Sequence, residues 1–411
     1  MRKEVLTMKY INGGVTAAKG FKASGIHCGI RKNQTKKDLA MIVSETKCTA
    51  AAVYTQNKVY GAPITVTRNN ISDGYAQAVI VNSGNANTCN ADGVEKAQMM
   101  CDIASKALGV DSKDVIVAST GVIGMTLDIT PIAEGAPALA SQISEKGGHD
   151  CAEAIMTTDT LPKEVAVEME IGGKKVTLGA CCKGSGMIHP NMATMLCFMT
   201  TDCNISSAYL QKALSDVVKD TFNMISVDGD TSTNDMVCIM ANGKAENDII
   251  DSDSADFETF KQALMSVSVK LSRLIAGDGE GAQRLLECNV TACTDEATAK
   301  KIAKSIICSS LVKTAMFGAD ANWGRILCAI GYTEGDFSVD TIDVYLSSCK
   351  GTIKVCENGA GIPFSEEKAK ERLLESEITL DVDMRQGEYS ATAWGCDLTY
   401  DYVKINGDYR T

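Results

Sequence analysis

Thr194 is the residue whose surroundings best suit nucleophilic chemistry in this chain. It follows a glycine-rich, proline-containing loop and opens an apolar segment, in the run Lys183-Gly-Ser-Gly-Met-Ile-His-Pro-Asn-Met-Ala-Thr-Met-Leu196. A threonine hydroxyl is a poor nucleophile without a nearby base, and cleavage just before the threonine would supply that base as a new α-amino group. A threonine that opens a strand is more often an ordinary β-branched residue of a sheet. Cleavage between Ala193 and Thr194 is therefore a hypothesis that needs support from other residues.

Three further segments could assist such a nucleophile, and each also has a purely structural interpretation. Ser119-Thr120-Gly121 is either a plain loop or a place where a hydroxyl and a backbone N–H point at a developing oxyanion. Lys183 is either a solvated loop charge or a cation that helps to keep the new amine neutral. Gly277-Asp-Gly-Glu-Gly281 follows a helical pattern and is first of all a helix end. Glu280 within it stands on a glycine-rich loop, which allows its side chain to approach a ligand closely.

Other common catalytic patterns find little support in the sequence. The three histidines, His27, His149 and His189, limit any serine- or cysteine-histidine arrangement, and no Gly-x-Ser-x-Gly elbow is present. A Walker A sequence is absent, as is a Gly-x-Gly-x-x-Gly placed between a strand and a helix. The cysteines form no Cys-x-x-Cys pair, which disfavours a zinc site.

Composition indicates an ordinary soluble protein with more than one domain. The chain has 411 residues, and its net charge of −12 argues against a surface that binds nucleic acid or anionic membranes. The N-terminus lacks the apolar core of a signal peptide, and no apolar run is long enough to span a membrane, so we expect a cytoplasmic protein. We interpret most of the 17 cysteines as buried free thiols, for example Cys101, Cys238, Cys308 and Cys328.

The hydrophobic pattern predicts a mixed α/β protein. Helical spacing predicts helices at about 94–108, 131–146, 206–223, 257–277, 296–315 and 365–375. Short β-like runs predict strands at 63–66, 78–81, 115–118, 165–171, 175–178, 194–200, 236–241, 341–346, 378–384 and 394–400. We expect a layered α/β core that spans the cleavage site, residues 1–282, followed by a smaller αβ domain, residues 283–411.

Several segments together resemble the glutamate N-acetyltransferase family, also called ornithine acetyltransferases, which recycle acetyl groups in arginine biosynthesis. The resemblance runs from Ile11 to the last residue and is carried by the following segments: Lys183–Leu196, Thr120-Gly121, Asn82–Asn87, Asp228–Asp235, Gly277–Gly281, Gly318–Arg325 and Tyr402–Thr411. It implies that the precursor cleaves itself between Ala193 and Thr194 into an α chain, residues 1–193, and a β chain that starts at residue 194.

The resemblance also implies the roles of individual residues. Thr194 would carry the acetyl group, and Thr120 and Gly121 would stabilise the oxyanion. The residues that would contact substrate are Thr160, Lys183, Thr194, Glu280, Asn406 and Thr411. The implied reaction moves acetyl from N-acetylornithine to glutamate without a metal or cofactor, and it leaves open whether acetyl-CoA is a second donor. The implied assembly is an α2β2 heterotetramer.

Two alternatives stay open at this point. An aminopeptidase or amidase could use the same N-terminal threonine with water as the acceptor. A protein that binds an amino acid without catalysis would never be cleaved.

Overall fold

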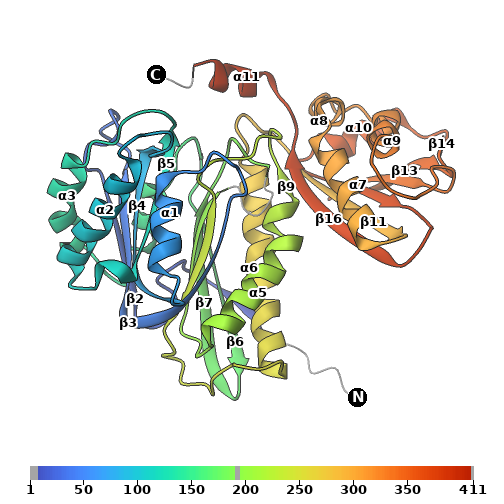
Figure 1. Ribbon diagram of the computed structural model, residues 1–411. Helices are drawn as coiled ribbons and strands as arrows, with labels where there is room; N and C mark the ends of the chain where they lie inside the picture. Colours follow the sequence, from blue (N-terminus) through green and yellow to red (C-terminus); the bar gives the residue numbers. More distant parts are fainter. Residues whose placement is uncertain (1–7, 190–194, 409–411) are drawn as a thin grey trace. The chain divides into compact units, whose positions relative to one another are not determined.

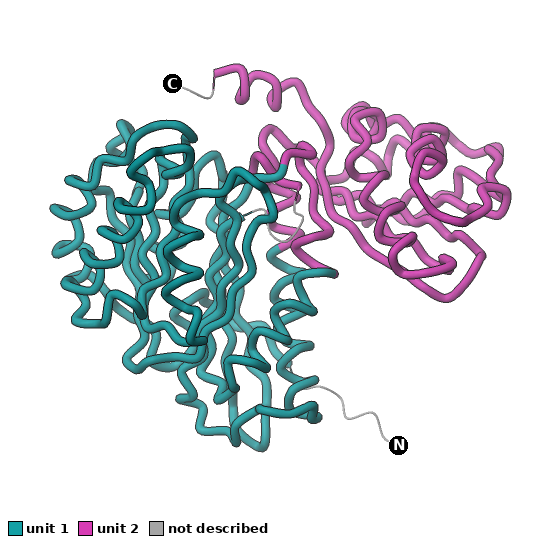
Figure 2. Tube along the Cα trace, in the orientation of Figure 1, with its two compact units in different colours: residues 1–184, 191–219, 231–271 teal, residues 185–190, 220–230, 272–411 magenta. Residues whose placement is uncertain are grey.

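Two separate β-sheets, each with its own helices, make up the mixed α/β fold (Figure 1). The structure is a computed structural model and describes residues 8–189 and 195–408. The chain divides into two compact units, of which unit 1 comprises residues 1–184, 191–219 and 231–271, and unit 2 comprises residues 185–190, 220–230 and 272–411 (Figure 2). The predicted α/β class is confirmed. The predicted domain boundary after residue 282 stays a prediction.

Unit 1 is built on a nine-stranded sheet of order β1-β6-β7-β8-β10-β3-β4-β5, with β2 paired to β3. Its strands are β1 (Lys9–Ile11), β2 (Phe21–Ile26), β3 (Leu39–Tyr54), β4 (Tyr75–Asn85), β5 (Val115–Val122), β6 (Lys163–Ile171), β7 (Lys174–Lys183), β8 (Leu196–Thr201) and β10 (Met236–Ala241). The pairs β8–β10 and β4–β5 are parallel, and the others are antiparallel. Strands β8 and β10, which follow residue 194 in the chain, thus lie between β7 and β3, which precede it.

The sheet of unit 1 is buried on both faces. Its helices are α1 (Ala62–Asn70), α2 (Gly93–Leu108), α3 (Thr130–Ser141), α4 (Gly148–Ala154), α5 (Ser207–Asp220), the start of α6 (Ala255–Gly277) and the short 3-10 helix η1 (Ser112–Asp114). Successive residues of β4 alternate between two apolar clusters: Val79 and Val81 belong to one, and Ala78 and Ile80 to the other. This period of two is that of a strand whose side chains point to opposite faces.

In unit 1, a local sequence rule explains the end of helix α2, whereas the predictions for helices α1 and α3 need correction: α3 ends at Ser141, before the expected end at residue 146. Helix α2 stops at Gly109, which has φ 72° and therefore suits the left-handed position after a helix. The prediction of a strand at 63–66 is wrong, because these residues lie in helix α1. Pro63 lies in the first turn, where proline is tolerated, and the buried side chains Ile64 and Val66 pack into the core. Packing outweighs the β preference of branched residues here.

Unit 2 contains a seven-stranded sheet of order β14-β13-β12-β15-β11-β16-β9. Its strands are β9 (Ile225–Ser226), β11 (Leu285–Cys293), β12 (Asp343–Ser348), β13 (Gly351–Glu357), β14 (Ala360–Gly361), β15 (Glu377–Asp383) and β16 (Tyr389–Cys396). Its helices are the end of α6, α7 (Glu296–Cys308), α8 (Ser310–Phe317), α9 (Trp323–Gly331), α10 (Glu366–Leu373), α11 (Tyr400–Gly407) and the 3-10 helix η2 (Phe222–Met224).

Two predictions for unit 2 need correction. The single helix expected at 296–315 is two helices, because Ser309 leaves the helical conformation and its hydroxyl accepts a hydrogen bond from Val312 N–H at the start of α8. The strand expected at 394–400 ends at Cys396, and Tyr400 instead begins helix α11, where its side chain is 84% exposed.

The cysteines mostly follow the prediction, since Cys101 and Cys238 are buried free thiols. Cys308, however, is only half-buried, and Cys328 is exposed on α9, so these two interpretations are corrected. Among the helices of the described ranges, none is both long and apolar enough to cross a membrane.

Candidate active site

Strand β8 starts two residues after Thr194, so its neighbours define the candidate site. Ala193, Thr194 and Thr411 lie outside the described residues, and their roles stay predictions. Leu196 pairs with Lys183 of β7 on one side and with Met236 of β10 on the other. The N–H of Met236 also donates to the carbonyl of Met195 at 2.8 Å. The chain directly after Thr194 is thus held by hydrogen bonds within the sheet.

Lys183, at the end of β7, is a buried cation beside a buried carboxylate. Its side chain is 9% exposed, and its Nζ lies 4.0 Å from Asp159 Oδ2. Burial lowers the pKa of Lys183 below its ordinary value, Asp159 opposes this shift, and the nearby cation Lys163 adds to it. The structure therefore places Lys183 as a fixed residue of the interior rather than as a solvated loop charge.

Asp159 was missed by the sequence analysis, and it organises this part of the site. Its fully buried carboxylate accepts hydrogen bonds from Lys163 Nζ at 2.7 Å, from Gly184 N–H at 2.7 Å and from Thr157 N–H at 3.0 Å. Burial alone would raise the pKa of Asp159, but the cations Lys183 and Lys163 outweigh it and hold that pKa well below the usual range. Asp159 thus ties the loop that carries Thr160 to the end of β7.

Thr160 itself is exposed and directly follows Asp159 in the chain. Thr160 was named only through the family resemblance, and that resemblance gave no indication of the buried ion pair beside it.

Asp235, directly before β10, is a second buried carboxyl that sequence reasoning missed. Burial raises its pKa well above the ordinary value, against the opposing effects of Ser232, Lys183 and Thr55. Its Oδ2 has no hydrogen-bond partner among the described residues. Lys183 and Asp235 are thus two buried ionisable groups whose pKa values are displaced in opposite directions by burial, and such displaced groups are common at functional sites.

Thr120 and Gly121 lie at the end of β5, beside Ser83 and Gly84 of the parallel strand β4. Gly121 has φ 134°, and a Cβ added there would lie 2.3 Å from the carbonyl carbon of Gly84. Only glycine fits such a conformation and such a close approach. The pairing becomes irregular at Asn85, which faces both Thr120 and Val122. An irregular strand end of this kind can direct backbone N–H groups away from the sheet.

Asn234 connects this strand end to the region of β10. Its buried amide donates to Ser119 O at 3.0 Å and to Ala86 O at 2.6 Å, and its Oδ1 accepts from the hydroxyls of Thr88 and Thr233, both at 2.6 Å. All four hydrogen-bonding positions of the carboxamide are thus occupied. The carbonyl of Ser119 belongs to the peptide that leads into Thr120, so Asn234 fixes the orientation of that peptide.

In unit 2, Glu280 and Asn406 come together. Glu280 is buried, and its Oε2 accepts a hydrogen bond from Asn406 Nδ2 of α11 at 2.8 Å. Glu280 N–H also donates to Ser185 O at 3.0 Å. A Cβ on Gly186 would lie within 2.4 Å of the Glu280 carboxylate, so the loop approaches that carboxylate closely only because residue 186 is a glycine.

The structure thus brings together Lys183 with Asp159 and Asp235, and Thr120 with Gly121, in unit 1. It brings together Glu280 with Asn406 in unit 2. In residues 8–189 and 195–408, no three His, Cys, Asp or Glu side chains are grouped so that they could hold a metal ion.

Comparisons with known proteins add the following findings. A sequence model described as the ArgJ family matches residues 22–411. The "arginine biosynthesis bifunctional protein ArgJ" of Caldanaerobacter subterraneus subsp. tengcongensis is 51% identical over 405 residues, which are 98% of this chain and 100% of that protein. The Bacillus subtilis protein of the same name is 48% identical over 403 residues, which are 98% of this chain and 97% of that protein. Among solved structures, the Bacillus halodurans protein argJ shares 46% identity, with a TM-score of 0.48, over 51% of this chain and 96% of that chain.

Proposed function

The chain belongs to the ArgJ family, and we propose that it is the acyltransferase that moves acetyl from N-acetylornithine to glutamate in arginine biosynthesis. The observation that carries this proposal is the match along essentially the whole chain to relatives named for arginine biosynthesis. The buried groups around the start of β8 and the end of β5 support this proposal, because fixed charges and fixed backbone donors are what acyl transfer requires.

The first proposed step is self-cleavage of the precursor. The Thr194 hydroxyl attacks the carbonyl carbon of Ala193, the peptide C–N bond breaks, and the resulting ester is hydrolysed by water. The products are an α chain of 193 residues and a β chain of 411 − 193 = 218 residues. The new α-amine of Thr194 has a reference pKa of about 7.7–8.0, so part of it is neutral near pH 7 and can act as a base. A nearby Lys183 cation would favour this neutral form.

The second proposed step is acetyl transfer by double displacement. The Thr194 hydroxyl loses its proton to the α-amine and attacks the acetyl carbonyl of N-acetylornithine. The oxyanion is stabilised by Thr120 and Gly121, at roughly 3–4 kcal/mol for each donor in comparable sites. Ornithine leaves with the proton of the α-ammonium. The amine of glutamate then attacks the acetyl-Thr194 ester and gives up a proton to the α-amine, the ester C–O bond breaks, and N-acetylglutamate leaves as Thr194 recovers its hydroxyl proton. The conformation of Gly121 and the anchoring of the Ser119–Thr120 peptide by Asn234 support this assignment, because oxyanion donors must be fixed in advance.

Charged residues are proposed to bind the ends of the amino-acid substrates. Lys183 suits a carboxylate, and Glu280 suits an ammonium group. The remaining proposed substrate contacts are Thr160, Asn406 and Thr411. The enzyme itself carries the acetyl group, so the reaction requires no metal or organic cofactor. We also propose acetyl-CoA as a second acetyl donor, and an α2β2 assembly of the cleaved chains in the cytoplasm.

Intact-mass analysis of the purified protein tests the scheme. We expect two chains from the wild type and from Thr194→Ser, which keeps a hydroxyl, but a single inactive chain from Thr194→Ala. A single uncut chain with full transferase activity would contradict self-cleavage, and an uncut, inactive wild type would favour an amino-acid-binding protein. Release of free acetate, with no N-acetylglutamate formed in the presence of glutamate, would favour an amidase.

A further inference from the structure

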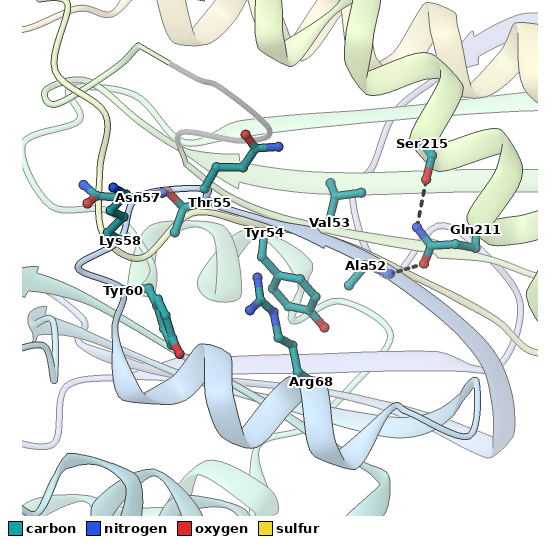
Figure 3. A pocket seen from close by; sticks show the side chains of 11 residues that line it. Ala52, Val53, Tyr54, Thr55, Asn57, Lys58, Tyr60, Arg68, Gln211 and Ser215 are labelled. Carbon is teal, nitrogen blue, oxygen red and sulfur yellow. Dashed lines mark hydrogen bonds between the residues drawn. The ribbon is translucent and has the colours of Figure 1, made fainter.

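A hollow of about 610 Å³ in unit 1 lies between the end of β3, helix α1 and helix α5 (Figure 3). Its volume falls within the range of small-molecule sites, roughly 300–1,000 Å³. Tyr54, Lys58 and Tyr60 come from β3 and the loop after it, Arg68 from α1, and Gln211 from α5. An adjoining hollow of about 370 Å³ shares Tyr54, Arg68 and Gln211. None of these side chains has a role in the proposed reaction.

The hollow is positively charged although the chain as a whole is acidic. Its lining contains Lys58 and Arg68 but no aspartate or glutamate, in a chain with a net charge of −12. Within the described ranges, neither Lys58 nor Arg68 forms a hydrogen bond or an ion pair, unlike many surface cations of this chain. Uncompensated cations in a concave site favour an anionic ligand.

Two aromatic rings hold Arg68. Its guanidinium lies 4.8 Å from the ring centroid of Tyr54 and 5.6 Å from that of Tyr60. Such cation–π contacts fix the guanidinium while leaving its N–H groups free for a phosphate, which arginine binds in a bidentate manner. Tyr60 is 46% exposed, so its ring also offers a surface on which a flat base can stack.

The hollow adjoins the candidate active site within unit 1. Thr55 N–H donates to Asp235 O at 3.0 Å, and Asn57 Nδ2 donates to Thr231 O at 2.9 Å, so the rim of the hollow is bonded to the segment before β10. Tyr54 pairs with Met236, which in turn pairs with Leu196. Two strand spacings therefore separate Tyr54 from Leu196, a distance of about 10 Å.

We propose that this hollow binds a nucleoside diphosphate group, with the diphosphate on Arg68 and Lys58 and the base against Tyr60. Either a free nucleotide or coenzyme A could supply that group. The coenzyme A form rests on the proposed transferase function, because the short distance to β8 would let the acyl arm extend from the hollow toward the start of that strand.

Calorimetric titration of the purified wild-type protein with ADP, and separately with coenzyme A, tests this inference. The variant Arg68→Gln should weaken ADP binding roughly ten- to a hundredfold, because a hydrogen bond to a charged group is lost. The matched control is Lys212→Gln, since Lys212 also lies over an aromatic ring but is paired with Asp253 and does not line the hollow. This control should bind ADP like the wild type.

The outcomes of these titrations distinguish a free nucleotide from coenzyme A as the ligand, and they distinguish failure of this inference from failure of the proposed function. If coenzyme A displaces ADP and Arg68→Gln weakens the binding of both, coenzyme A is supported as the ligand. If ADP binds and coenzyme A does not displace it, a free nucleotide is supported. No ADP binding by the wild type, or equal binding by Arg68→Gln, would overturn the inference. Acetyl exchange between N-acetylornithine and glutamate should be unchanged in Arg68→Gln. A wild-type protein that binds ADP but shows no acetyl exchange would therefore contradict the proposed function and not the ligand site.

Discussion

Replacing Asn234 by aspartate should disable acetyl transfer, because it removes the amide donor that fixes the Ser119–Thr120 peptide, together with the donor to Ala86 O. The side chain keeps its shape, but the carbonyls of Ser119 and Ala86, now 3.0 and 2.6 Å from the amide nitrogen, would face an oxygen. A buried carbonyl left without a donor costs about 1–3 kcal/mol. The Thr88 hydroxyl lies 3.2 Å from Ala86 O and can still donate to it, so this cost falls on Ser119 O, and the free energy of unfolding should fall by roughly 1–3 kcal/mol. The loss of one correctly placed oxyanion donor lowers kcat by about 10²–10³.

Thr88→Val is the matched control for stability. It removes a hydroxyl that donates to Asn234 Oδ1 at 2.6 Å but leaves both amide donors in place. We expect it to lose about 1–3 kcal/mol of stability while it keeps a nearly normal kcat. Urea denaturation, steady-state acetyl transfer and intact mass would be measured on both variants. A folded Asn234→Asp protein with the wild-type kcat would refute the positioning role, as would an equal fall in kcat in Thr88→Val.

Three further predictions address other parts of the site. Gly121→Ala should abolish transfer and destabilise the protein, because its Cβ would lie 2.3 Å from the carbonyl carbon of Gly84. The control is Gly124→Ala, at φ 75° with no atom within 4 Å of the new Cβ, which should cost only about 1–2 kcal/mol of stability and keep activity. Equal acetyl-transfer kinetics in the two variants would argue against an oxyanion role for Gly121. The folded-state pKa of Asp235 is raised, so its ionisation opposes folding above its unfolded pKa of about 3.9. Asp235→Asn should therefore match the wild type in stability in acid and become the more stable of the two as pH rises from 4 to 7. Urea titrations at each pH would test this, and a stability difference that does not change with pH would contradict it. Glu280→Gln should raise KM for N-acetylornithine while self-cleavage stays intact, and an unchanged KM would remove Glu280 from substrate binding.

The sequence predicts those elements that obey one local rule. Strand β10 has the bounds predicted for it, 236–241, because a short apolar run marks a buried strand. Helix α6 ends at Gly277 as predicted, because its apolar residues recur at helical spacing up to that glycine. Pro63–Val66 misled the prediction because its β-branched residues pack as one side of a helix. Such tertiary preference is not visible in a short window of sequence.

The candidate site was only partly predictable. Lys183 and Glu280 were singled out from their glycine-rich surroundings and assigned to substrate binding by the family resemblance, and the structure shows that both are buried. The sequence analysis gave no role to the partners that hold the site, Asp159, Asn234 and Asp235, although Asn234 and Asp235 lie in the segment Asp228–Asp235 that resembles the family. Asn234 contacts Ser119, which is 115 residues away in the chain, so only the folded structure reveals that contact.

The order of strands in unit 1 has a consequence for assembly. After cleavage at the proposed position, β8 and β10 would belong to one polypeptide, while β7 and β3 on either side would belong to the other. The two polypeptides would then be interleaved in a single sheet and could not separate without breaking it. Folding of the uncut precursor is a first-order process, but recovery of the cleaved enzyme from denaturant would be second order and would depend on concentration. The cut would thus make folding a step that the molecule completes once, before it becomes an enzyme.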